Sequence, residues 1–271
     1  MYCDFFGFTE RPFKPSPDPR FLYLSPSHEE ALRAIIYGIH ERLGIMCITG
    51  EVGTGKTTVL NTALHWLSGN TRIAFVPNYG LQFDDLLVLV LSELKIAKLN
   101  ENVSKIDALD KLKQFSIEQV SIGGTVALIV DEAQNLTKAD LEQVRLLSNI
   151  ETPSDKLVQI ILSGQPELDH KLEDPDLRQL KQRIYRRFHI LALNPEQTFE
   201  YIRHRLQLAS RLNGNFFDAS TSDEIWLHTE GIPRKINILC DNVLRIAFER
   251  KLKALDPTIV SAAAFELHWQ P

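Results

Sequence analysis

The segment Gly50–Thr58 constrains the fold more than any other part of the chain. It fits the pattern G-x-x-x-x-G-K-T and consists of Gly50, Glu51, Val52, Gly53, Thr54, Gly55, Lys56, Thr57 and Thr58. A short apolar run, residues 44–49, precedes it, and residues 55–67 carry apolar side chains at helical spacing. Glycines let such a loop turn its main-chain N–H groups into one concavity, and a helix starting there aims its positive end at the same place. The pattern predicts a strand, a phosphate-binding loop (P-loop) and a helix.

The side chains of this loop suit ATP bound together with Mg²⁺. Lys56 is placed to reach the outer phosphates as a point charge, and the Thr57 hydroxyl is placed to ligate the metal ion. We therefore predict that the whole segment binds nucleotide, with Gly53, Gly55 and Lys56 around the phosphates. A merely flexible Gly/Thr turn would need neither the strand before it nor the helix after it.

Apolar segments typical of buried strands alternate with helical segments over residues 27–194. The predicted strands are residues 44–49, 73–76, 125–130, 157–162 and 188–193, and the predicted helices are residues 27–41, 55–67, 83–95, 105–120, 138–150 and 175–186. This alternation predicts an α/β fold of the P-loop NTPase kind, in which helices cover both faces of a central, mostly parallel sheet.

Two further regions flank this α/β domain. The pattern of residues 195–271 predicts helices and no strands. The clearest helix lies between Ile236 and Phe248, where apolar residues recur at i, i+3 and i+4. We assign them to a small all-α lid domain that follows a nucleotide-binding domain over residues 27–194. Residues 1–26 are rich in proline and aromatic residues, which excludes a long helix and disfavours disorder. They predict an N-terminal arm that packs on the core.

Composition narrows the partners and the compartment. The 271 residues carry a net charge of −5, so a nucleic-acid site would have to be local. Cys3, Cys47 and Cys240 lack metal-ligand spacing, and their scarcity suggests a reducing compartment. No apolar stretch approaches the roughly 20 residues that cross a membrane. The N-terminus also lacks a basic leader region. We expect a cytoplasmic protein without a membrane segment.

Polar residues follow two of the predicted strands and suit hydrolysis. Asp131 ends an apolar strand and is placed to hold Mg²⁺, while the adjacent Glu132 is suited to activate a water molecule as general base. Behind a P-loop this pair outweighs the alternative of a solvated strand end. After the strand at 157–162 we favour Gln165 as the group that orients the water, with Ser163 as its competitor. A turn whose polar residues merely leave the core remains an alternative for both.

Residues 178–187 are strongly basic in an otherwise acidic chain. The run contains Arg178, Lys181, Arg183, Arg186 and Arg187, and no acidic residue. It suits a solvated helix face, an arginine finger given to the nucleotide of a neighbouring subunit, or contacts with nucleic-acid phosphates. Because the run precedes a predicted strand of the sheet, we favour the finger and Arg183 as the residue.

A second cation lies in the predicted lid. Pro233 fits the first turn of a helix, which places Arg234 near a helix start, where a cation opposes the helix dipole. A bound phosphate would favour the cation there. Otherwise Arg234 is an ordinary surface residue.

Together these motifs resemble the AAA+ ATPases, in which the basic run and the Gly231–Arg234 segment correspond to the arginine finger and sensor 2. More narrowly, several segments resemble the ExeA (GspA) type of ATPase, associated with general secretion and pilus-type envelope machines. They are residues 5–8 (FFGF), 11–13 (RPF), 17–23 (PDPRFLY), 50–57 (GEVGTGKT), 131–136 (DEAQNL) and 164–168 (GQPEL). The resemblance covers nearly the whole chain. It also extends to TniB-like regulators of DNA transposition.

The resemblance carries its own expectations. It implies a homo-oligomer, a ring or a filament, in which Arg183 acts on the neighbouring subunit, and an Arg234 that reports nucleotide state to the lid. It also places residues 21–28 near the adenine, with Tyr23 either stacking on it or only packing the arm. ExeA itself continues into a membrane segment and a peptidoglycan-binding region, whereas this sequence ends at Pro271, which puts secretin assembly in doubt.

We therefore predict an ATP hydrolase, in which water attacks the γ-phosphate directly and the nucleotide cycle remodels an oligomer or a partner. The favoured setting is a secretion or pilus-type envelope machine with a protein partner. The alternative is a DNA-binding regulator of transposition. A nucleotide-dependent scaffold with negligible turnover is disfavoured by the Asp131–Glu132 pair, and a kinase by the lack of an acceptor site.

Overall fold

A computed structural model describes residues 2–14, 18–67, 69–77, 80–99, 101, 103–153, 155–210 and 216–269. Pro15 and Pro17, two prolines of the predicted N-terminal arm, lie outside the described residues. The chain divides into two compact units. The sheet unit comprises Ser27–Gly50 and Val59–Ile190, and the lid unit comprises Met1–Pro26, Glu51–Thr58 and Leu191–Pro271.

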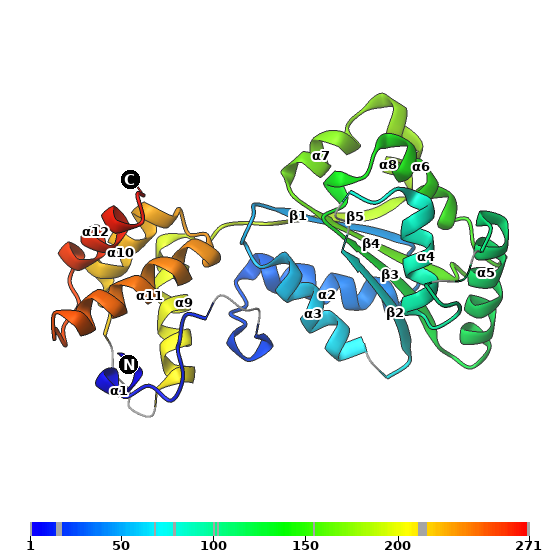
Figure 1. The fold of residues 1–271 in the computed structure, drawn as a ribbon. Coiled ribbons are helices and arrows are strands. Elements are labelled where there is room, and N and C mark those ends of the chain that lie inside the picture. Colours follow the sequence, from blue (N-terminus) through cyan, green and yellow to red (C-terminus); the bar gives the residue numbers. More distant parts are fainter. Residues whose placement is uncertain are drawn as a thin grey trace. The chain divides into compact units, whose positions relative to one another are not determined.

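The sheet unit is built on a five-stranded parallel sheet of order β2-β3-β4-β1-β5 (Figure 1). The strands are β1 (Ile45–Gly50), β2 (Thr71–Pro77), β3 (Thr125–Asp131), β4 (Val158–Gly164) and β5 (Ile184–Ile190). This confirms the predicted α/β fold. Because β4 lies between β1 and β3, the carboxyl ends of these three strands share one edge of the sheet, where an α/β fold carries its ligand site.

Helices cover both faces of the sheet. One face is covered by α2 (Pro26–His40) and α3 (Lys56–Leu67), and the other by α4 (Phe83–Glu93), α5 (Lys105–Ser121), α6 (Lys138–Leu147), α7 (Pro166–Leu172) and α8 (Arg178–Arg183). Side chains of β1 alternate between the two apolar clusters. Met46 and Ile48 join α2 and α3, whereas Ile45 and Cys47 join the opposite cluster. Burial on both faces explains why the strand is apolar throughout.

The predicted last strand was misplaced. We predicted a helix over residues 175–186 and a strand over 188–193. The structure instead has a short 3₁₀ helix η3 (Pro175–Leu177), then α8, and β5 already at Ile184. The strand therefore contains Arg186 and Arg187. Among the described residues it pairs with β1 alone, and half-exposed residues of such an edge strand can carry charges that a central strand would exclude.

The lid unit joins the arm to four helices, α9 (Pro195–Ala209), α10 (Ala219–Thr229), α11 (Pro233–Glu249) and α12 (Pro257–Glu266). The arm forms a short helix α1 (Tyr2–Phe6) and a 3₁₀ turn η1 (Pro19–Phe21). Its rings Phe6, Phe8 and Phe13 are buried in one cluster with residues of these helices. The sequence predicted an arm packed on the core, and these partners lie in the lid helices.

A buried cation fastens the arm. Arg205 of α9 is 5% exposed and lies over the Phe21 ring, 4.8 Å from its centroid. Its Nε donates to the main-chain oxygen of Pro12 at 2.7 Å, and its Nη1 donates to the Tyr201 hydroxyl at 2.8 Å. Aromatic faces and carbonyl oxygens thus take the place of a carboxylate partner for this guanidinium.

Candidate nucleotide site

The P-loop connects β1 to α3, as the motif predicted. Gly53 and Gly55 adopt positive φ angles of 84° and 104°, a conformation that glycine enters without the cost of a Cβ. The carbonyl oxygen of Glu51 accepts from the Thr54 amide at 3.2 Å, from the Thr54 hydroxyl at 2.9 Å and from Lys56 Nζ at 3.0 Å. Helix α3 begins at Lys56, so its first amides belong to the loop. These features fit a phosphate site.

Arg234 lies directly on this loop within the lid unit. Its main-chain N–H donates to the Gly53 oxygen at 3.2 Å, and a Cβ added to Gly53 would stand 2.5 Å from the Arg234 Cβ. Gly53 is therefore needed both for its backbone conformation and for the close approach of α11. Pro233 occupies the first turn of that helix, as predicted. The structure thus brings together two residues that lie far apart in the sequence.

Asp131 ends β3, an inner strand that lies between β2 and β4. It is 6% exposed, and its Oδ1 accepts from the Ser163 hydroxyl at 2.7 Å and from the Glu132 amide at 3.1 Å. Ser163, on the neighbouring strand β4, is fully buried. The two residues form a fixed oxygen-rich group at a strand end, which suits the hard cation Mg²⁺.

Glu132 follows Asp131 and points to a different pair of residues. Its Oε2 accepts from Gln134 Nε2 at 2.6 Å and from Gln165 Nε2 at 3.1 Å. Gln165 is the cap of α7, just beyond β4. Of the two candidates after β4, Ser163 therefore serves the aspartate and Gln165 serves the glutamate.

The basic run does not form one cationic patch. Arg186 pairs with Glu30 at 2.7 Å, Arg187 pairs with Glu173 at 2.8 Å, and Lys181 also pairs with Glu173. Within the described ranges, neither Arg178 nor Arg183 has an ion pair. Arg183 is the last residue of α8 and makes one long contact, 3.4 Å from its Nη1 to the Ser148 hydroxyl. Among the predicted finger candidates, Arg178 and Arg183 are thus the ones without an ion pair in the described part of the chain, although the charge of Arg183 helps to lower the pKa of Glu151.

Tyr23 packs within the lid unit. Its ring stands 6.0 Å from the rings of Tyr201 and His204, and its hydroxyl donates to Glu200 at 2.5 Å. Burial, and then the bond to Glu200, raises the pKa of the Tyr23 hydroxyl. The arrangement is what the packing alternative requires, and the adenine contact stays a prediction.

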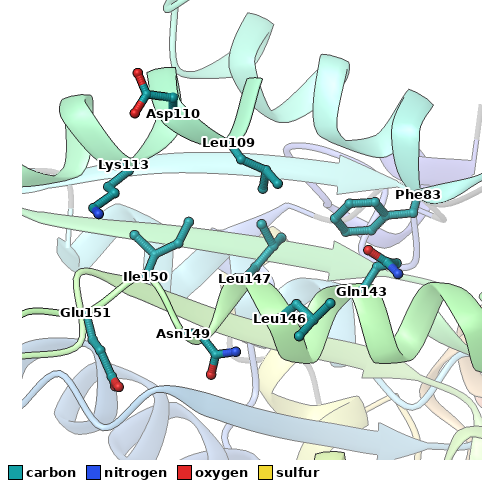
Figure 2. A pocket seen from close by; sticks show the side chains of 10 residues that line it. All are labelled: Phe83, Leu109, Asp110, Lys113, Gln143, Leu146, Leu147, Asn149, Ile150 and Glu151. Carbon is teal, nitrogen blue, oxygen red and sulfur yellow. The ribbon is translucent and has the colours of Figure 1, made fainter. Parts of the chain in front are cut away.

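A cavity of about 310 Å³ lies elsewhere in the sheet unit, among α4, α5 and α6 (Figure 2). Its apolar side chains include Phe83, Leu109 and Leu147, and its rim carries Lys113 and Glu151. None of the predicted nucleotide-site residues lines it. Among the described residues, no helix is both long enough and apolar enough to cross a membrane.

Comparison with known proteins bears on this geometry. A family model described as an AAA domain matches residues 39–172. General secretion pathway protein A of Aeromonas hydrophila is 40% identical over 267 residues, which cover 98% of this chain. The chain is similar to the AAA+ proteins and carries the AAA domain match over residues 39–172. It resembles this relative of the GspA (ExeA) type across almost its entire length, yet it spans only 48% of the relative's own length.

Solved structures support the AAA+ fold at lower identity. Cdc6p from Pyrobaculum aerophilum matches with a TM-score of 0.72 and 18% identity, over 96% of this chain and 72% of its own. The Aeropyrum pernix ORC1 protein, solved in complex with DNA, matches with a TM-score of 0.71 and 16% identity, over 96% and 70%. The RuvB branch migration motor of Thermotoga maritima matches with a TM-score of 0.59 and 15% identity, over 90% of this chain and 70% of its own. At such identities the likeness concerns the fold alone.

One residue of the site was missed by sequence reasoning. Gln134 contacts Glu132 and the turn that carries Gln165, although no role was predicted for it. The available signal was its position two residues after Glu132, at a strand end where polar side chains of neighbouring strands converge.

Proposed function

We propose that this AAA+ protein binds ATP with Mg²⁺ and hydrolyses it, and that the nucleotide cycle remodels an oligomer or a protein partner in a secretion or pilus-type envelope machine. The observation that carries the proposal is the Glu132 carboxylate. It follows the inner strand β3, beside Asp131, and amide donors from Gln134 and Gln165 hold one of its oxygens. The similarity to GspA supports the setting.

In the proposed reaction each residue has one task. Gly53, Gly55 and Lys56 surround the phosphates, and Thr57 and Asp131 supply oxygen ligands. Bound Mg²⁺ would offset charge that develops on the phosphate oxygens. Glu132 takes the proton of the attacking water, and Gln165 helps to place that water. Tyr23 would lie near the base if the arm contributes to nucleotide recognition.

Two residues connect the site to movement and to assembly. Arg234 already touches the P-loop at Gly53, so phosphate occupancy there can be sensed by α11. Arg183 is exposed at the end of α8 and is available to a neighbouring subunit's nucleotide, which requires a homo-oligomer, either a ring or a filament. A cytoplasmic location remains part of this proposal.

The test measures the ATP hydrolysis rate and the particle size of the purified protein, with and without Mg²⁺ and with and without double-stranded DNA. We expect Mg²⁺-dependent hydrolysis that rises with protein concentration and does not respond to DNA. Stimulation by DNA together with filament formation would instead identify a regulator of the transposition type. ATP binding without turnover above background would contradict the hydrolase proposal.

A further inference from the structure

The backbone around Glu132 is held in an unusual conformation. Glu132 has φ 54° and ψ 39°, in the left-handed region that is unfavourable for a non-glycine residue. It precedes the 3₁₀ turn η2 (Ala133–Asn135), and the buried side chains of Ala133 and Leu136 anchor that turn in the core. The surrounding structure must therefore impose the conformation, since the local sequence does not favour it.

A lysine from α7 fixes the same turn from outside. Lys171 Nζ donates to the main-chain oxygen of Gln134 at 2.6 Å and to that of Leu136 at 2.7 Å. The main chain of residue 134 is thus held on both sides. The position of the Gln134 Cα atom is therefore fixed, and the side chain can vary only through its rotamers.

The side-chain amide of Gln134 bridges two groups of the site. Its Oε1 accepts from the main-chain N–H of Gln165 at 3.1 Å, and its Nε2 donates to Glu132 Oε2 at 2.6 Å. The chemistry of the partners determines this orientation. A main-chain N–H can only donate, so the atom facing it is the amide oxygen, and the NH₂ group then faces the carboxylate, which can accept.

Gly164 gives the bridge its space. A Cβ added at this position would stand 2.9 Å from Gln134 Oε1 and 2.9 Å from a methyl group of Leu168. Gly164, the last residue of β4, therefore has to be small for the Gln134 side-chain amide to reach the main chain of Gln165. The bridge thus depends on the β4–α7 turn as well as on η2.

The donors all meet at one oxygen of the glutamate. Gln134 and Gln165 both donate to Oε2, and no residue in the described part of the chain hydrogen-bonds Oε1. One carboxylate oxygen is therefore held in place while the other is left to accept a proton. Such a division suits a general base, which must be oriented without losing its acceptor.

We infer that Gln134 is a positioning residue for ATP hydrolysis, an inference that rests on the function proposed above. Its amide aims the Glu132 carboxylate and couples it to Gln165, so that the glutamate and the water-placing residue move as one group. Gln134 acts through Glu132 and does not contact the nucleotide in this role. Sub-ångström misplacement of a catalytic base is costly, because proton transfer depends steeply on geometry.

The test replaces Gln134 by Leu, which has similar bulk and no hydrogen-bonding group, and by Asn, whose shorter amide cannot reach both partners. We expect kcat for ATP hydrolysis to fall about 10- to 100-fold in both variants. ATP affinity and KM should stay within about twofold of wild type, because Gln134 makes no contact with the bound nucleotide in this role. Gln143→Leu, an amide-to-leucine change on α6, is the matched control and should keep the wild-type kcat.

A double-mutant comparison separates positioning from a general loss of packing. In single-turnover reactions, Gln134→Leu added to Glu132→Gln should cause no further loss, because the residue acts only through the glutamate. A further loss of the same size as in the wild-type background would overturn the inference, and so would wild-type kcat in both Gln134 variants. An inactive wild-type protein would instead refute the proposed hydrolase function itself.

Discussion

Two charged segments of the sheet unit are organised in opposite ways. In the acidic turn, residues 131–136, neutral hydroxyl and amide groups hold the carboxylates, and Asp131 is nearly buried. In the basic run, residues 178–187, all the charged side chains except the half-buried Arg187 are exposed, and three of the charges pair with surface carboxylates. Ion pairs thus offset three charges of the basic run, whereas hydroxyl and amide donors orient the carboxylates of the acidic turn.

The difference bears on our proposal that one chain prepares the acidic site, whereas the basic run acts on a second chain. Neutral donors orient a carboxylate without cancelling its charge, which suits the metal and general-base roles that we propose for the acidic turn. In the basic run, Arg183 stays outside the ion pairs formed by Arg186 and Arg187 and can meet a charge on another molecule. The sequence shows the charges of both segments but not which of them are paired.

The largest effect should come from removing the general base of the acidic turn. Glu132→Gln is expected to lower kcat about 1,000-fold, because the amide cannot take the proton from water. ATP affinity should be retained, since the phosphate contacts lie in the P-loop. Nucleotide binding and steady-state hydrolysis measured on the same preparation check this. Undiminished turnover would remove the base assignment and, with it, the distinction between the two segments.

Within the basic run, Arg183→Ala should lower kcat about 100-fold or more in the assembled protein. Arg186→Ala is the control, because Arg186 is already paired with Glu30 at 2.7 Å, and it should stay within about twofold of wild type. If Arg183 acts in trans, mixing Arg183→Ala with Glu132→Gln protein should restore part of the activity. Equal losses in the two arginine variants would indicate a general electrostatic role.

The hydroxyl that holds Asp131 should have a smaller effect. Ser163→Ala leaves Oδ1 without its 2.7 Å donor and should raise the Mg²⁺ concentration needed for half-maximal hydrolysis about tenfold. Ser116→Ala is a matched control, since that serine is also fully buried but its hydroxyl donates to the Leu112 carbonyl of its own helix. A change in ATP turnover without a change in Mg²⁺ dependence would argue against metal binding by Asp131.

The smallest effect concerns the carboxylate that neutralises the basic run. Hydrogen bonds from Lys181, and then from Arg187, hold the pKa of Glu173 below its ordinary value of 4.5. A lowered pKa stabilises the fold above that ordinary value, and the gain is lost as the pH falls through the lowered pKa.

Glu173→Gln should therefore lower the melting temperature near neutral pH by no more than about 2 °C, since exposed pairs contribute little. The difference from wild type should vanish well below pH 4.5. Thermal unfolding at both pH values measures this, with Glu118→Gln, an exposed glutamate of α5, as control. A larger loss would mean that the basic run is structural.

Much of the fold was predictable because the central strands are buried on both faces. The apolar runs that became β1, β3 and β4 have no exposed face on which polar residues could interrupt the pattern. The edge strand β5 was displaced in the prediction, because its exposed positions hold Arg186 and Tyr185 and disguise the alternation. For this reason, the hydrophobic pattern of a sequence identifies buried strands better than edge strands.

Within the site, the P-loop and the Asp131–Glu132 pair were visible because each is contiguous in the chain. The roles of Ser163 and Gln165 could not be separated, since both follow the same strand and only their neighbours on β3 distinguish them. The partners of the arm were equally hidden, because Arg205 and the rings that it meets are far apart in sequence.

The sequence by itself determined the parallel α/β architecture, the phosphate loop and the acidic strand end, since each depends on residues that follow one another along the chain. Only the tertiary structure decided which oxygen each donor meets, which arginines are paired, and that Gln134 bridges Glu132 to Gln165. The reason is that hydrogen bonds are directional. A hydrogen bond needs two groups aligned within about 3 Å, and the packing of β3 against β4 sets that alignment.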